Sequence, residues 1–336
     1  MSLIESCQFE GYKRVLNKIR KPIEKELIKL ENRFRSIIET DVTLIKEIFT
    51  HIVSTKGKRL RPILLFLCSS LQGEPTEKTY QAATIVELLH TATLIHDDVV
   101  DNSEMRRGTP SVNSIWENKI SVLIGDYLFA EVLYNLRKLN DLNMLEIISN
   151  ITRQMSQGEL LQMEKAHDFQ MDEQTYFRLI ANKTASLTAA TCQLGALTST
   201  QPDPNHVENL RVFGENLGIA FQIKDDLLDY DGSEKKLGKP IGKDLLENII
   251  TLPVLYSLKQ TDEQTREKML SMLEHGEHYQ QETMLQFVKE TGGIRYANQQ
   301  AELFIQKARN CLDRYADSPY KDSLILLSNF ITSREV

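Results

Sequence analysis

Two clusters of aspartates are the side chains in this sequence best suited to chemistry. The pattern Asp-Asp-x-x-Asp occurs twice, at Asp97, Asp98 and Asp101 and again at Asp225, Asp226 and Asp229. Residues four apart share one face of a helix, so the outer carboxylates of each cluster project together. Such like-charge pairs cost a helix about 0.2–0.5 kcal/mol unless a cation binds. Carboxylates near a helix C-terminus suit a hard cation such as Mg²⁺, and two clusters predict a site that holds a diphosphate between several Mg²⁺ ions.

The same clusters could be solvated helix ends or calcium-storage sites. A single cluster of this kind is more often a solvated acidic helix end than a binding site. Here each copy follows ten or more mostly apolar helical positions, which makes coincidence the weaker interpretation. Calcium storage fits poorly, because the sequence lacks the glycine and terminal glutamate of an EF-hand loop.

Basic residues flank both clusters along the chain. They are Lys58, Arg59 and Arg61 before an apolar segment, Arg106 and Arg107 after the first cluster, Lys183 among small residues, and Lys239 and Lys243 after the second cluster. Helix N-termini bind anions, and arginine grips phosphate oxygens in pairs. Singly these are typical surface charges, but together they suit a site for two diphosphates.

Helices must position these residues, because helical periodicity dominates the sequence and strand-like alternation is scarce. We expect helices over about 9–38, 62–72, 77–101, 119–138, 142–166, 172–198, 205–230, 251–259, 263–275, 280–291, 294–316 and 320–332. Loops are expected over 102–110 and 231–243. No long polar linker interrupts the pattern, so residues 1–336 are expected to form a single all-α domain.

Composition excludes several classes of protein. The 336 residues are 41% hydrophobic and 26% charged, with a formal net charge of -7, which argues against nucleic-acid binding. No segment is apolar enough to span a membrane, and the N-terminus lacks the apolar core of a signal peptide. The cysteines are widely spaced, at Cys7, Cys68, Cys192 and Cys311. They are expected to be free thiols, so we expect a cytoplasmic protein.

Several segments resemble the trans-isoprenyl diphosphate synthases, or polyprenyl synthetases. They are GKRLRP at 57–62, ELLHTATLIHDDVVDNSEMRRG at 87–108, NKTASL at 182–187, FQIKDDLLDY at 221–230 and GKPIGKDL at 238–245. The resemblance covers about residues 10–335 and is nearest to long-chain members such as octaprenyl diphosphate synthase. It implies a single-domain, isoprenoid-synthase-type helical bundle around a deep apolar cavity, assembled as a homodimer.

The resemblance also implies an activity in isoprenoid biosynthesis. The chain would condense isopentenyl diphosphate with an allylic prenyl diphosphate, with Mg²⁺, and would make a long all-trans, octaprenyl-like product. The metal would be bound by both aspartate motifs, Asp97, Asp98 and Asp101 and Asp225, Asp226 and Asp229. The allylic diphosphate would be bound by Arg106, Lys183 and Lys239, and isopentenyl diphosphate by Lys58, Arg61, His90 and Arg107. Oxygens near the allylic cation would come from Thr184 and Gln222. An isolated histidine on an apolar helix is more often a core residue, but His90 lies two turns before Asp97 and can share its face.

Four alternatives remain open on the sequence alone. Many members of the family carry a further lysine before the Thr-Leu-Pro at 251–253, which is absent here, as in catalytic subunits of heteromeric synthases. The chain could therefore work alone or with a different partner subunit. A short-chain farnesyl or geranylgeranyl synthase and a non-catalytic prenyl-binding subunit are further alternatives, as is a terpene cyclase, although a cyclase needs no second diphosphate site.

Overall fold

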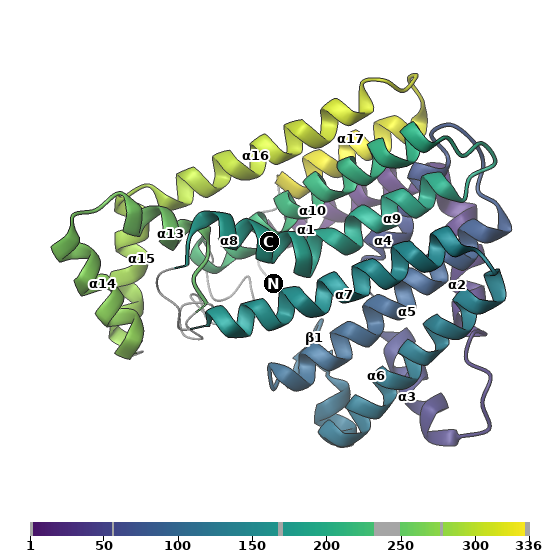
Figure 1. The fold of residues 1–336 in the computed structure, drawn as a ribbon, viewed down its shortest axis with the longest axis horizontal. Coiled ribbons are helices and arrows are strands. Elements are labelled where there is room, and N and C mark those ends of the chain that lie inside the picture. The colour runs from purple at the N-terminus through teal and green to yellow at the C-terminus, as the bar shows by residue number, and fades with distance from the viewer. Residues whose placement is uncertain (1–2, 56, 167–170, 232–248, 276–277, 333–336) are drawn as a thin grey trace. The chain divides into compact units, whose positions relative to one another are not determined.

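The computed structural model describes residues 3–55, 57–166, 171–231, 249–275 and 278–332. Helices make up almost all of its regular structure (Figure 1). In the described residues the strands are β1 and β2, two residues each, paired with Met105 opposite Pro110 and Arg106 opposite Thr109. The predicted all-α fold class is therefore confirmed. No helix in these ranges is long and apolar enough to cross a membrane.

The first elements of the chain are α1 (Leu3–Arg20), the 3-10 turn η1 (Lys21–Ile23), α2 (Glu24–Arg35), α3 (Thr43–Ser54), α4 (Leu60–Ser69), α5 (Glu77–Val100), β1 (Met105–Arg106), β2 (Thr109–Pro110), α6 (Val112–Leu139) and α7 (Leu142–Lys165). They are followed by α8 (Glu173–Ile180), the π-helical turn η2 (Ala181–Ala185), α9 (Ser186–Leu197), α10 (Pro204–Asp231), α13 (Leu252–Lys259), α14 (Glu263–His275), α15 (His278–Glu290), α16 (Gly293–Leu312) and α17 (Pro319–Thr332).

The chain divides into two compact units. Unit 1 comprises Met1–Ile148, Thr191–Glu208 and Asp317–Ser323, and unit 2 comprises Ser149–Ala190, Asn209–Ala316 and Leu324–Val336. Helices α7, α9, α10 and α17 contribute residues to both units. The single-domain organisation stays a prediction.

Unit 1 is built around α5, which packs against α6, α4 and α2. Thr76 and Thr79 form a capping box that satisfies backbone donors at the start of α5. Most of α5 is buried, including Leu88 and Leu89, because its small and branched apolar residues cover more than one face. Apolar packing therefore fixes this helix up to its last turn, where the first aspartate motif lies.

Unit 2 has its own apolar core, in which α13 packs against α16, α15 and α8. Ile223 and Leu227 of α10 belong to this core and are almost fully buried. They alternate along the helix with the second aspartate motif, so their burial sets the rotation of α10 and decides which aspartates face outward.

Local structure departs from the sequence prediction at several places, and α1 and α6 begin six and seven residues earlier than expected. The helix expected over 9–38 is interrupted by η1 at Pro22, because proline lacks an N–H and clashes with the preceding turn. The helix expected over 172–198 is divided by the π-helical turn η2. Helix α3 was not predicted, and the expected loop 102–110 contains the β1–β2 hairpin.

Candidate active site

The first aspartate motif lies in unit 1, at the end of α5. The second carboxylate, Asp98, is only 3% exposed and accepts a hydrogen bond of 2.8 Å from Nε of Arg106. The backbone carbonyl of Asp98 accepts another bond, 3.3 Å long, from the amide of Asn113 in α6. Asp97 is half-buried and Asp101 is exposed. The motif thus uses its middle carboxylate to hold the β1–β2 hairpin and presents its outer carboxylates towards the surface.

Arginines surround His90 in the same unit. Nη1 of Arg61 lies 3.0 Å from Nε2 of His90, and a guanidinium only donates, so this imidazole nitrogen accepts. Burial lowers the pKa of His90 well below its usual value, and Arg61 and Arg107 lower it further. Burial also lowers the pKa of Arg61 to about 10. The charge of Glu87 opposes this shift, and the charge of Arg107 adds to it. Arg61 therefore stays charged at neutral pH, and several cations stand around a neutral imidazole, an arrangement that favours an anion.

Glu87 provides a buried negative charge beside these cations. It is 5% exposed and accepts a hydrogen bond of 2.5 Å from Nη1 of Arg59. Arg59 has a left-handed backbone, with φ of 52°, immediately before α4, and its guanidinium lies 5.2 Å from the ring centroid of Phe34. A strained conformation of this kind persists only where its surroundings hold it. The ion pair and the ring contact therefore fix the GKRLRP segment in place.

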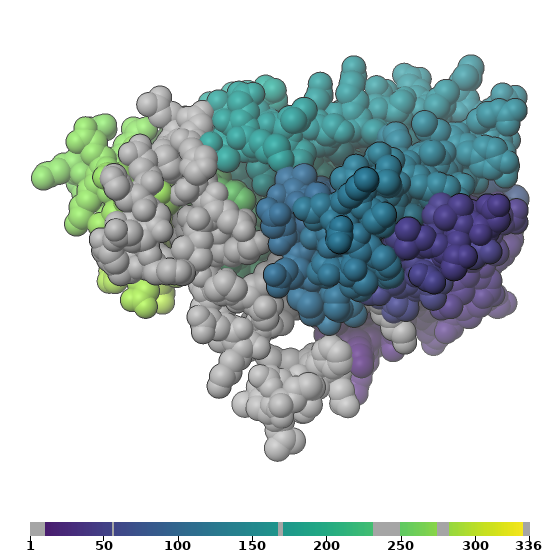
Figure 2. Space-filling model, turned by 90° about the horizontal axis from the view of Figure 1, so that it is seen from below, coloured from purple at the N-terminus to yellow at the C-terminus, as the bar shows by residue number. Residues whose placement is uncertain are grey.

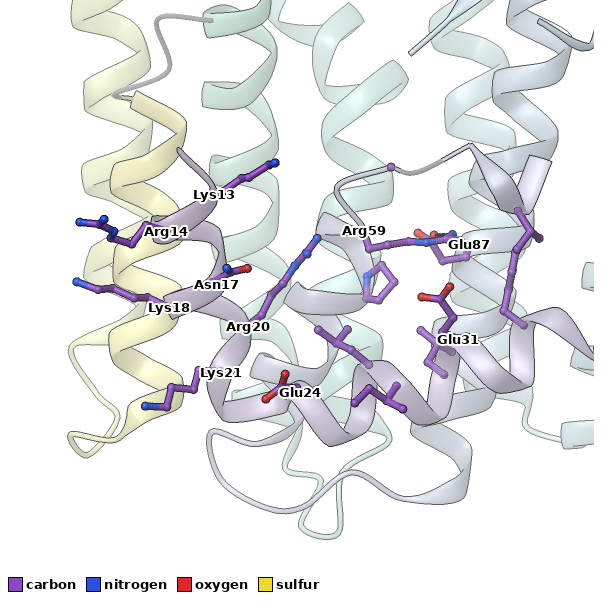
Figure 3. Close-up of a pocket in the computed structure, with 17 residues that line it drawn as sticks. Lys13, Arg14, Asn17, Lys18, Arg20, Lys21, Glu24, Glu31, Arg59 and Glu87 are labelled. Carbon is purple, nitrogen blue, oxygen red and sulfur yellow. Dashed lines mark hydrogen bonds and ion pairs between the residues drawn. The ribbon is translucent and has the colours of Figure 1, made fainter. Parts of the chain in front are cut away.

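Lys58 is contacted by the N-terminal helix. Its ammonium lies 4.5 Å from the ring centroid of Tyr12, and its carbonyl accepts a hydrogen bond from Nη2 of Arg20. Beside this segment is a hollow of about 1080 Å³, in which Arg20 extends towards the segment and Arg59 approaches Glu87 (Figure 3). Its charged lining residues are Lys13, Arg14, Lys18, Arg20, Lys21 and Arg59, with Glu24, Glu31 and Glu87. The hollow beside the GKRLRP segment is therefore lined by more basic than acidic side chains.

The second aspartate motif lies in unit 2, near the end of α10. Its middle carboxylate, Asp226, is 8% exposed and accepts hydrogen bonds of 2.6 Å from the hydroxyl of Tyr176 and 2.8 Å from Nε2 of Gln222. Burial raises the pKa of Asp226 to about 7, although both hydrogen bonds oppose the shift. Asp225 is exposed and Asp229 half-buried. As in the first motif, the middle carboxylate is used inside the protein and the outer two lie nearer the surface.

The π-helical turn η2 carries Lys183 and Thr184. Nζ of Lys183 lies 2.8 Å from Oε2 of Glu159 and donates a hydrogen bond of 2.8 Å to Oε1 of Gln162, both on α7. Helix α7 comes close at Gly158, where a Cβ would lie 2.6 Å from the backbone nitrogen of Lys183. A side chain at this position would force the two helices apart. Wide turns of this kind occur frequently at functional sites.

Thr184 belongs to a directed chain of hydrogen bonds in unit 2. Its hydroxyl donates to Oε1 of Gln222 over 2.7 Å, and Nε2 of Gln222 then donates to Asp226. The Tyr176 hydroxyl donates to the other oxygen of Asp226. The bonds from Thr184 and from Tyr176 thus converge on Asp226. The amide of Gln222 therefore has one orientation, and the threonine oxygen keeps its lone pairs for another group.

The predicted site residues thus fall into two groups. Unit 1 contains Lys58, Arg61, His90, Arg106 and Arg107 with the first aspartate motif, and unit 2 contains Lys183, Thr184 and Gln222 with the second. Lys239 and the GKPIGKDL segment lie outside the described residues. Two of the predicted diphosphate ligands, Arg106 and Lys183, are paired with carboxylates of the protein.

Several residues at these sites were missed by sequence reasoning. They are Tyr12, Arg20 and Glu87 in unit 1 and Glu159, Gln162 and Tyr176 in unit 2. Two spacings gave a usable signal. Glu87 precedes His90 by three residues on α5, and Glu159 precedes Gln162 by three on α7, so each pair shares a helix face. Tyr12, Arg20 and Tyr176 carry no such local signal.

The donor set suits a hard divalent cation. Each motif offers carboxylate oxygens, the ligands that Mg²⁺ prefers, at its first and fifth positions. Within the described ranges, no three His, Cys, Asp or Glu side chains are gathered as a metal cage. Mg²⁺ commonly keeps waters and substrate phosphates in its shell and uses one or two carboxylates, so the motifs fit the ion without a cage.

Comparison with known proteins gives one consistent result. The polyprenyl synthetase family matches residues 42–291. Octaprenyl diphosphate synthase of Escherichia coli is 34% identical over 300 residues, which cover 89% of this chain and 92% of that protein. Heptaprenyl diphosphate synthase component 2 of Geobacillus stearothermophilus is 32% identical over 310 residues, covering 92% and 96%.

A solved structure extends the likeness to three dimensions. The polyprenyl synthase of Caulobacter crescentus, complexed with calcium and isoprenyl diphosphate, has a TM-score of 0.87 and 31% identity, and the alignment covers 96% of this chain and 98% of that one. The sequence match spans well over half of the chain and includes both aspartate motifs. The chain therefore belongs to the polyprenyl synthetase family.

Proposed function

We propose that this chain is a Mg²⁺-dependent trans-polyprenyl diphosphate synthase that joins isopentenyl diphosphate to an allylic prenyl diphosphate. The observation that carries the proposal is the repeated aspartate motif, with outer carboxylates nearer the surface in both copies, together with the cationic cluster around His90. Family membership and relatives named as heptaprenyl and octaprenyl diphosphate synthases support a long all-trans product.

The proposal assigns the site residues to two diphosphates and a metal. The metal is held by the two aspartate motifs, directly by Asp97, Asp101, Asp225 and Asp229, with Asp98 and Asp226 as their middle members. The allylic diphosphate is bound by Arg106, Lys183 and Lys239. Isopentenyl diphosphate is bound by Lys58, Arg61, His90 and Arg107. The cations around the neutral His90 support the last assignment, since an anion there relieves repulsion between arginines.

In this mechanism the outer carboxylates of the two aspartate motifs would hold Mg²⁺, which would supply positive charge to offset the charge that gathers on the leaving diphosphate. The bond between C1 of the primer and the diphosphate oxygen breaks, and oxygens of Thr184 and Gln222 stabilise the allylic cation. The isopentenyl double bond attacks C1, and the resulting cation loses a proton to the released diphosphate. The neutral imidazole of His90, whose Nε2 accepts from Arg61, would donate a hydrogen bond from Nδ1 without adding charge.

Product length is proposed to depend on the wall of the cavity along α5. Ala92 lies five residues before Asp97, which is about 7.5 Å along a helix, and it is 1% exposed. A growing chain anchored at Asp97 and Asp101 would extend back along this helix. The small side chain at position 92 would leave room for a long, octaprenyl-like tail.

The assembly is proposed to be a cytoplasmic homodimer of single-domain chains. Part of α6, blue in Figure 2, lies at the surface of its unit. This helix has five exposed large apolar residues, Ile115, Val122, Leu123, Leu133 and Tyr134. Such a stripe is costly in water and is normally covered by a partner. The name of the Geobacillus relative, a component 2, keeps a heteromer open as the other outcome.

The test is to incubate the purified chain alone with labelled isopentenyl diphosphate, Mg²⁺ and primers of several lengths, and then to size the products. Long prenyl diphosphates from the chain alone are expected. Products that appear only after a second subunit is added would support the heteromer. Light scattering on the same sample would give the mass of the assembly, and a monomer mass at micromolar concentration would contradict the homodimer.

A further inference from the structure

Lys183 is one of the cations assigned to the allylic diphosphate, yet in the structure two side chains of α7 already contact it. An ammonium group has three N–H donors. One is directed to Oε2 of Glu159 at 2.8 Å and a second to Oε1 of Gln162 at 2.8 Å. One donor is left for a phosphate oxygen, and its direction is set by the other two.

The backbone around this contact is arranged for close approach. Lys183 lies in the π-helical turn η2, whose closing bond runs from the Ser186 N–H to the carbonyl of Ala181. Gly158 precedes Glu159 and admits the backbone of Lys183, since a Cβ there would lie 2.6 Å from its nitrogen and 2.9 Å from its Cα. On the other side, a Cβ at Gly218 of α10 would lie 2.6 Å from Cα of Ala185. Because neither glycine has a side chain, α7 and α10 can both approach the backbone of the turn closely.

The position of Glu159 distinguishes it from a surface counter-ion. Its side chain is 22% exposed and that of Lys183 is 29% exposed. Glu164, five residues further along α7, is 72% exposed and lies 3.8 Å from Lys165. Exposed pairs of that kind contribute little, whereas a partly buried pair between two helices fixes the direction of a long flexible side chain.

We infer that Glu159, with Gln162, is a positioning residue that presents one N–H of Lys183 to the allylic diphosphate. The inference rests on the proposed function, which supplies the diphosphate. Glu159 acts through its oxygen as an acceptor, so an amide in its place preserves the role and a methyl group does not. If Glu159 were only a competing counter-ion, either replacement would release Lys183 and tighten substrate binding.

The experiment compares Glu159→Ala, Glu159→Gln and Gln162→Ala, with Glu164→Ala as matched control on the same helix and Lys183→Ala as reference. For each folded variant, KM and kcat are measured for both substrates, and calorimetry gives Kd for an unreactive thiodiphosphate analogue of the primer. Glu159→Ala is expected to raise the primer KM and the analogue Kd about tenfold, as for one charge-assisted phosphate bond. Glu159→Gln should return both to within about threefold of wild type.

The KM for isopentenyl diphosphate should be unchanged in these variants, as should every parameter of Glu164→Ala. A lower primer KM in Glu159→Ala, equal effects of the alanine and glutamine variants, or equal effects on both substrates would overturn the inference. If Glu159→Ala does not fold, Gln162→Ala carries the test, and an unchanged analogue Kd there counts against positioning. A wild type that is inactive with every primer, both alone and with a second subunit added, contradicts the proposed function instead.

Discussion

The two aspartate motifs share one sequence pattern but hold their middle carboxylates differently. Asp98 in unit 1 is paired with a cation, Arg106, whereas Asp226 in unit 2 accepts from two neutral donors, Tyr176 and Gln222. Burial raises the pKa of Asp226 to about 7, and its two neutral donors oppose this shift. Two motifs of one pattern can thus present their outer carboxylates towards the surface while their middle carboxylates are held by different kinds of partner.

The largest expected effect tests what the motifs have in common. Asp97→Ala and Asp225→Ala should each lower turnover by several orders of magnitude while the fold stays intact, because each removes a carboxylate proposed to hold Mg²⁺. The melting temperature should stay the same or rise slightly, since one like-charge pair is lost. Asp41→Ala, at an exposed aspartate, is the control. Near-normal turnover of either motif variant with Mg²⁺ would exclude a metal role for that carboxylate.

The next effect tests how the motifs differ. Asp98→Asn should lower the free energy of unfolding by about 3 kcal/mol, because Arg106 then keeps a partly buried charge without its counter-ion. Asp226→Asn should cost less, about 1–2 kcal/mol, because no charge is abandoned and the amide oxygen still accepts from one of the two donors, while the amide nitrogen faces the other donor. Urea unfolding at neutral pH without divalent cation measures both. Equal losses would show that the two supports are energetically alike.

Substituting one cation in each unit should raise the KM for a different substrate in each case. Arg107→Ala in unit 1 is expected to raise the KM for isopentenyl diphosphate, and Lys183→Ala in unit 2 the KM for the primer. Loss of one charge-assisted phosphate bond corresponds to about 1.5–3 kcal/mol, or roughly tenfold to a hundredfold. Steady-state kinetics with each substrate varied in turn provide the measurement. If both variants affect both substrates equally, the assignment to two pockets is wrong.

A smaller effect concerns product length and has a matched position in each motif. Ala92 precedes Asp97 by five residues, and Ala220 precedes Asp225 by five; both are buried. Phenylalanine at either site should cost about 1–3 kcal/mol by overpacking. Only Ala92→Phe is expected to shorten the product, because the tail is proposed to run along α5. Sizing the products of both folded variants tests this, and an unchanged distribution in Ala92→Phe would remove Ala92 from the cavity wall.

The smallest expected effect tests the neutral hydrogen-bond donors of Asp226. Tyr176→Phe removes one hydrogen bond to Asp226 and should cost about 1–2 kcal/mol, with Gln222 still donating. Tyr320→Phe is a comparison at a tyrosine of intermediate exposure, far from this carboxylate in the sequence. Thermal unfolding of the two variants gives the difference. A loss as large as that of Asp98→Asn would mean that the hydroxyl, and not the pair of donors, supports the motif.

Much of this fold was predictable because helices carry a local signal. The pattern of apolar residues located α5 and α10 within one or two residues, and the spacing of four gave the outer carboxylates one face. Helix breaks were less accessible. Pro22 is an explicit signal that the prediction over 9–38 passed over, and nothing in the letters of 181–185 marks a π-helical turn. The short hairpin 105–110 is too brief to show alternation.

The candidate site divides in the same way. Motif spacing and family resemblance named the groups that would touch substrate and metal, but not the side chains that hold them. Tyr176 is 50 residues from Asp226, and Arg20 is 38 residues from Lys58, so their pairing depends on how helices pack. Periodicity describes one helix at a time and therefore does not predict the partners that a second helix supplies.

The π-helical turn has a consequence for how this family of sequences could change. A turn closed from residue i to i+5 contains one residue more than an α-helical turn. Deleting a single residue within Ala181–Ala185 would restore the ordinary winding. Because about five residues of π winding turn the chain by as much as about four of α winding, the helices on either side would keep nearly the same faces. Tyr176 would then still face Asp226, whereas the widened turn that carries Lys183 and Thr184 would be lost. In this segment a one-codon deletion would therefore remove the local geometry of the site and leave the two flanking helices intact.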